Sequence, residues 1–156
     1  MSLGGGPDGG ELQQVSEQIQ QIEQGIQAVE AEIQSVRDEQ SDIDEAIDAI
    51  QELETGSTVQ VPIGGGAYVR ATIEDIDEVI VGLGADYATE AEHEDAIDLL
   101  EEQKDQLGDR IEELNQELAE LETEEEQLNQ RAQQLQQQQM QQQMGALGGG
   151  GEGDDE

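Results

Sequence analysis

The chain has 156 residues, with 40 Asp and Glu against 5 Lys and Arg, a formal net charge of -35. Aromatic residues make up 1% of the chain and cysteine is absent, which excludes a core of bulky rings, disulfide bonds and thiolate metal sites. The negative charge argues against nucleic acid or a membrane as partner, and the chain shows neither a membrane-spanning apolar stretch nor a signal peptide, so we expect a cytoplasmic protein.

The charge itself has two interpretations. A highly charged chain with few bulky apolar residues is often disordered. Alternatively, the chain folds in concentrated salt, where repulsion between carboxylates is screened to within a few Å. The regular apolar periodicity described next favours the salt-adapted, halophilic interpretation.

Composition divides the chain into five segments, which we take in order. They are a flexible Gly-rich N-terminus (1–10), an N-terminal coiled-coil helix (11–55), a double β-hairpin segment for oligomerisation (56–89), a C-terminal coiled-coil helix (90–144) and a flexible Gly-rich acidic tail (145–156).

The first helical segment carries an apolar heptad pattern. Its apolar residues recur in steps of three and four, with one step of seven that skips Gln40; they are Leu12, Val15, Ile19, Ile22, Ile26, Val29, Ile33, Val36, Ile43, Ile47 and Ile50. This pattern predicts a left-handed coiled coil with a partner helix. Gly56 is expected to stop the helix, which would span about 67 Å.

The middle segment changes to the alternation that is typical of strands. Two hairpins are expected, the first turning at the glycines of residues 64–66 and the second at residues 84–86. A phosphate-binding loop is the alternative for residues 64–66, but the Lys-Ser/Thr and the helix that such a loop needs do not follow.

Four short strands cannot bury both of their faces and leave open edges. We therefore expect strands of other chains to complete them, so that the hairpins join the subunits of an oligomer. The residues expected to assemble subunits are Val59, Val61, Ile63, Tyr68, Val69, Ile73, Val79, Val81, Leu83 and Tyr87.

The second helical segment repeats the heptad pattern, and Thr89 with Glu92 has the spacing of a capping box before it. Its core positions are Ile97, Leu100, Lys104, Leu107, Ile111, Leu114, Leu118, Leu121, Glu125, Leu128, Ala132 and Leu135. If the helices fold back on each other with paired numbers summing to 147, the two patterns begin and end together. The predicted fold is α+β, a long antiparallel two-helix coiled coil with two β-hairpins between the helices, weakened by polar layers at Gln40 and Lys104.

The C-terminal helix continues past the last predicted pair, where residues 133–144 read QQLQQQQMQQQM. Met140 and Met144 are expected to be exposed there, with Leu147 following. One interpretation is a fraying polar helix end. The other is an adaptable apolar surface that binds unfolded chains weakly, to which Leu12, Val15 and Ile19 would contribute from a thinly held last turn.

Residues that would indicate catalysis are scarce. Asp42, Asp44 and Asp48 lack EF-hand spacing and fit a solvated acidic helix face. His93, the sole histidine, is expected at the surface among acidic neighbours. No catalytic set, metal site or cofactor motif is found, so an enzyme is not expected.

Taken together, the order helix, two hairpins, helix resembles archaeal prefoldin alpha subunits over residues 11–144. The most specific part is the block between the helices, ETGSTVQVPIGGGAYVRATIEDIDEVIVGLGADYATE, because two hairpins are typical of the alpha class and one of the beta class.

The resemblance implies an ATP-independent chaperone subunit in a hexamer of two alpha and four prefoldin beta subunits, in which the hairpins complete an inter-subunit β-barrel. The tips of its coiled coils would hold non-native client proteins and deliver them to a group II chaperonin. The residues placed at the client-binding tip are Leu12, Val15, Ile19, Leu135, Met140, Met144 and Leu147.

Two other classes of function compete with this interpretation. A structural coiled-coil scaffold or adaptor would bind one folded partner and protect no denatured protein. An enzyme, or an arm that positions nucleic acid, would need catalytic groups or basic charge that the chain lacks.

Overall fold

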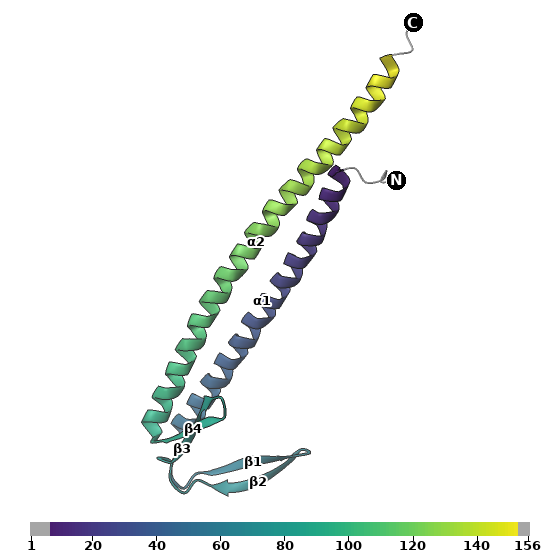
Figure 1. Cartoon of the computed structure of the whole chain (residues 1–156). Helices are drawn as coiled ribbons and strands as arrows, with labels where there is room; N and C mark the ends of the chain where they lie inside the picture. Colours follow the sequence, from purple (N-terminus) through teal and green to yellow (C-terminus); the bar gives the residue numbers. More distant parts are fainter. Residues whose placement is uncertain (1–6, 153–156) are drawn as a thin grey trace. The chain divides into compact units, whose positions relative to one another are not determined.

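The computed structural model describes the backbone of residues 7–152 and the side chains of residues 10–145. The outermost parts of the two ends expected to be flexible, residues 1–6 and 153–156, lie outside the described residues. The elements follow in the order α1 (Pro7–Glu52), β1 (Thr58–Gly64), β2 (Ala67–Thr72), β3 (Val79–Gly84), β4 (Tyr87–Ala91) and α2 (His93–Glu152) (Figure 1). This confirms the predicted order of helix, two hairpins and helix.

The chain divides into two compact units. The first comprises residues 1–33 and 113–156, and the second comprises residues 34–112. Within each unit, a stretch of α1 lies antiparallel beside a stretch of α2, and the second unit also holds both hairpins (Figure 1).

The seam between the helices is the main apolar core. All predicted heptad positions on both helices are buried or half-buried, and the most enclosed of them are Val15, Val29, Ile33, Val36, Ile47, Leu114 and Leu135. In the first unit, a Cβ built on Gly25 would lie 3.7 Å from Leu121 Cδ1, within one residue of the predicted pairing. The heptad pattern therefore predicted the buried face of each helix. It also predicted, to within one residue, how the two helices pair at Gly25 and Leu121.

A polar layer interrupts the seam in the second unit, as the skipped heptad position predicted. Gln40 Nε2 donates a hydrogen bond to the backbone oxygen of Lys104 at 3.2 Å, and Lys104 Nζ lies 2.7 Å from Asp44 Oδ1. The hydrogen bond with Asp44 raises the pKa of Lys104 above 10.5. The contribution of the Lys104 ammonium to this exposed pair is therefore present below pH 10.5 and is lost as the pH rises through the higher folded-state pKa.

We expect Gln40→Leu to stabilise the fold by about 1 kcal/mol, because a polar residue in a coiled-coil core costs stability. In this variant the backbone oxygen of Lys104 loses the Gln40 donor, but its position inside α2 still provides a helical backbone donor. Thermal unfolding followed by circular dichroism measures the change, with Gln20→Leu on the exposed face of α1 as the matched control. A lower melting temperature for Gln40→Leu than for the wild type would show that the hydrogen bond outweighs apolar packing.

Each hairpin forms its own two-stranded antiparallel sheet. In the first, Val59 pairs with Ala71 and Val61 with Val69, and in the second, Val81 pairs with Thr89. Both predicted turns are present. Residues 64–66 all have positive φ, which glycine adopts without strain, whereas the second turn places Ala85 and Asp86 at φ 50° and 66°.

Several predicted boundaries differ from the structure. Helix α1 ends at Glu52, so Gly56 does not cap it; Gly56 N instead donates to Ile73 O at 2.8 Å, where the first hairpin begins. The predicted capping box is wrong, because Thr89 belongs to β4 and α2 begins at His93.

The helices also extend into the ends that were expected to be flexible. Helix α1 begins at Pro7 rather than residue 11, and α2 continues through the Gly-rich residues to Glu152 rather than ending at residue 144.

Candidate functional site

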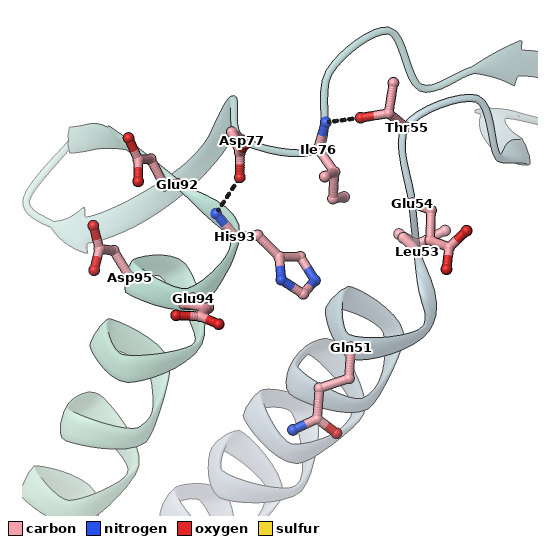
Figure 2. A pocket seen from close by; sticks show the side chains of 10 residues that line it. All are labelled: Gln51, Leu53, Glu54, Thr55, Ile76, Asp77, Glu92, His93, Glu94 and Asp95. Atoms are coloured by element: carbon pink, nitrogen blue, oxygen red, sulfur yellow. Dashed lines mark hydrogen bonds between the residues drawn. The ribbon is translucent and has the colours of Figure 1, made fainter.

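The end of α1, the linkers and the start of α2 converge on a small polar hollow in the second unit, lined in part by Thr55, Asp77 and His93 (Figure 2). The N–H of His93 donates to Asp77 Oδ1 at 3.3 Å, and its imidazole Nε2 contacts the backbone oxygen of Ile50. The N–H of Ile76 donates to Thr55 Oγ1 at 3.1 Å. His93 is therefore half-buried and ties the start of α2 to α1, which corrects its expected surface position.

The contacts in this hollow tie the linkers and the two helices together. The His93 imidazole contacts a backbone oxygen, which is no substrate for a general base. Within the described residues, no three His, Asp or Glu side chains are grouped so as to hold a metal ion. Asp77 caps the start of α2 from outside the helix, sixteen residues before His93. No short-range spacing in the sequence predicts such a cap.

The first hairpin presents an uncovered apolar surface. The strand register puts Val59, Val61, Val69 and Ala71 on one face, and side chains 61–70 are all exposed. Among the predicted assembly residues, Val61, Val69, Ile63 and Tyr68 are strongly exposed, while Val59 and Ile73 are half-buried. An isolated two-stranded hairpin is marginally stable in water, so this surface fits a partner chain.

The second hairpin packs one face on its own chain. Val81 is only 4% exposed, and Gln103 Nε2 on α2 donates to Gly82 O in the same strand at 2.8 Å. Val81 is therefore not free for another chain, and Val79 is half-buried on the same face.

Ile80, which sequence reasoning missed, is 76% exposed on the opposite face of β3. Residues 79–81 are all apolar, so the alternation of the strand does not show whether Ile80 or its neighbours Val79 and Val81 face outward. The predicted assembly residues Leu83 and Tyr87 are also exposed, although Leu83 lines a hollow together with Gln103 and Leu107 of α2.

At the opposite end of the helices, the structure separates the residues predicted to form a client-binding tip. Val15 and Leu135 are buried in the seam, and Leu12 and Ile19 are half-buried. These four residues thus occupy the seam positions that their heptad phase predicts, and the two helices cover each other at this level, which leaves them little exposed surface for the tip contact also expected of them. The side chain of Leu147 lies outside those described, although its backbone is helical.

Met140 and Met144 remain uncovered, at 63% and 70% exposed. They lie in residues 136–145 of α2, which we call the α2 tip and which continue past the start of α1 within the first unit (Figure 1). Gln139 continues the heptad phase and is half-buried, so Met140 is turned about 100° away from the seam. The methionines thus form a separate apolar stripe on the flank of α2.

Comparison with known proteins decides the family. A family model described as prefoldin subunit matches residues 22–138. The chain belongs to the prefoldin subunit family.

Curated relatives agree with this assignment. A protein named prefoldin subunit alpha from Haloarcula marismortui is 59% identical over 113 residues, covering 72% of this chain and 73% of the relative. The prefoldin subunit alpha of Halorubrum lacusprofundi is 61% identical over 114 residues, covering 73% of this chain and 74% of its own. A solved chain of the filamentous PFD from Methanocaldococcus jannaschii is 28% identical, with 75% of this chain and 93% of that chain covered at a TM-score of 0.49.

Membership in this family shows what class of protein the chain is. This prefoldin family member is a chaperone subunit rather than an enzyme, of the alpha type found in haloarchaea, and its family assembles with other prefoldin subunits. No helix in the described part of the chain has an apolar stretch that could span a membrane.

Proposed function

We propose that this chain is the alpha subunit of a cytoplasmic hexamer with four beta subunits, which holds non-native proteins at the tips of its coiled coils without ATP. The single observation that carries the holding function is the methionine stripe at Met140 and Met144, which is exposed and turned away from the seam. Methionine side chains are flexible and polarisable, so they adapt to varied apolar partners.

The uncovered hairpin surfaces support the assembly part of the proposal. On the first hairpin, Val61 and Ile63 are 43% and 66% exposed, and on the second, Ile80 is 76% exposed. Strands of neighbouring subunits would cover them and close a β-barrel, which removes the open strand edges.

Client release follows from weak contacts at each tip. Burying one apolar side chain completely contributes about 1.5–3 kcal/mol, so two methionines hold a client only loosely. Several tips on one assembly raise the effective concentration of the remaining contacts. A client can then leave one tip at a time, without nucleotide, and pass to a group II chaperonin.

The double substitution Met140→Ser and Met144→Ser tests the holding function. We expect the assembled variant to lose most of its suppression of aggregation when a denatured protein is diluted into molar KCl without ATP, because the apolar stripe is gone. Light scattering over time measures the loss.

Gln20→Ser and Gln24→Ser are the matched control, since both side chains are exposed on α1 away from the methionines. Unchanged suppression by the methionine variant would refute the stripe as the holding surface. No suppression even by the wild-type assembly would favour the scaffold or adaptor function instead.

A further inference from the structure

We propose that the α2 tip is adapted to acidic non-native polypeptides, because its own residues carry no carboxylate although the chain is otherwise strongly acidic. This rests on the proposed holding function and specifies the class of client. Three observations support it: the distribution of acidic residues, the pairing of Glu11 and the exposure of the methionine stripe.

Acidic residues are distributed very unevenly. They make up 40 of the 156 residues, about one in four, yet residues 127–151 contain none. Arg131 is the sole charged residue in that stretch. The α2 tip therefore lies in a nearly neutral segment of a chain whose net charge is -35.

One other long stretch is free of acidic residues, and it is informative. Residues 55–73, which comprise the first hairpin and its flanks, also contain no Asp or Glu and include a single arginine, Arg70. That hairpin carries the exposed apolar surface to which we assign contact with a partner subunit. Both acid-free stretches therefore bear exposed apolar side chains, which is the arrangement expected where other acidic chains must approach.

The structure also neutralises an acid that α1 brings beside the stretch. Arg131 Nη2 lies 2.8 Å from Glu11 Oε1, in a hydrogen bond between opposite charges. The arginine thereby compensates a carboxylate near the tip. Beside Met140 and Met144, exposed glutamines such as Gln137 and Gln141 carry amide groups that can donate hydrogen bonds to carboxylates.

Screening by salt explains why carboxylates need to be absent only from the α2 tip and not from the rest of the helices. At 1 M ionic strength the Debye length is about 3 Å, so only carboxylates in near contact with a partner repel it. Acids elsewhere on the helices can remain without affecting binding. A neutral or basic client would not require the removal of carboxylates from the contact surface, whereas an acidic client would.

Binding of three labelled peptides to the assembled hexamer tests the proposal. The peptides share one pattern of Leu and Val, with Glu, Gln or Lys at every intervening position, so that only their charge differs. Fluorescence anisotropy gives each Kd in 1 M and 3 M KCl. The test variant is Gln137→Glu with Gln141→Glu, which flanks the methionines, and the control is Gln20→Glu with Gln24→Glu, which adds equal charge to α1.

We expect the wild type to bind the Glu peptide about as tightly as the Gln peptide. The test variant should weaken the Glu peptide about threefold in 1 M KCl, and less in 3 M KCl, while changing the Gln peptide little. The control variant should change neither.

Equal weakening of all three peptides, or no change in any of them, would overturn the adaptation to acidic clients and leave the holding function intact. A wild-type preference for the Lys peptide over the Glu peptide would overturn it as well. Failure of the wild type to bind any peptide would overturn the holding function and this proposal together.

Discussion

Replacing Val61 and Ile63 with Asp is expected to abolish assembly with partner subunits while leaving the coiled coil helical. Both side chains are exposed in the single chain, so the substitutions remove little internal packing. In an assembled barrel, however, they would place unpaired carboxylates in an apolar interface, which costs several kcal/mol. Mass measurement by light scattering, with circular dichroism at 222 nm as the check on helicity, distinguishes the two effects.

Gln60→Asp and Arg70→Asp provide a control on the same hairpin. The strand register pairs Gln60 with Arg70, on the face opposite Val61. We expect this variant to keep more of the wild-type assembly than the Val61 and Ile63 variant does, because the polar face of the hairpin is the one expected to meet water. Full assembly of the Val61 and Ile63 variant would contradict the interface that we assign to this hairpin.

The largest loss of stability is expected from Leu114→Ala. Leu114 is 0% exposed, the most enclosed large side chain among those described. Truncating such a side chain lowers the free energy of unfolding by about 3 kcal/mol, because the cavity is only partly refilled. Urea unfolding of the isolated chain, followed by circular dichroism, measures this decrease.

Leu83→Ala is the matched control, since it makes the same chemical change at an exposed side chain. We expect it to lower the free energy of unfolding by about 1 kcal/mol or less. Equal losses for the two variants would mean that the seam is not the main source of stability in the chain.

Much of the fold could be read from the order of residues alone. The steps of three and four along α1 and α2 predicted the buried face of each helix, including the polar positions Gln40 and Lys104. Heptads make this possible because burial in a two-helix seam depends only on the position of a residue within the repeat. The strand alternation and the glycines of residues 64–66 predicted the first hairpin in the same way.

The candidate sites were less predictable. Val15 and Leu135 were assigned both to the seam and to the client-binding tip, and the length of overlap between the helices decides that they are buried. Sequence patterns also favoured Val81 over Ile80 for assembly, although the packing of the second hairpin on its own chain buries the former and exposes the latter. In both cases the deciding partner lies far away along the chain.

The sequence by itself therefore determined the two helices, the two hairpins, the apolar seam and the acid-free stretches, because each depends on local periodicity or composition. Only the tertiary structure decided which apolar side chains remain exposed, how Asp77 caps α2 and how Arg131 neutralises Glu11. Each of these depends on where the chain folds back on itself, and a contact between distant residues leaves no periodic signal in either segment.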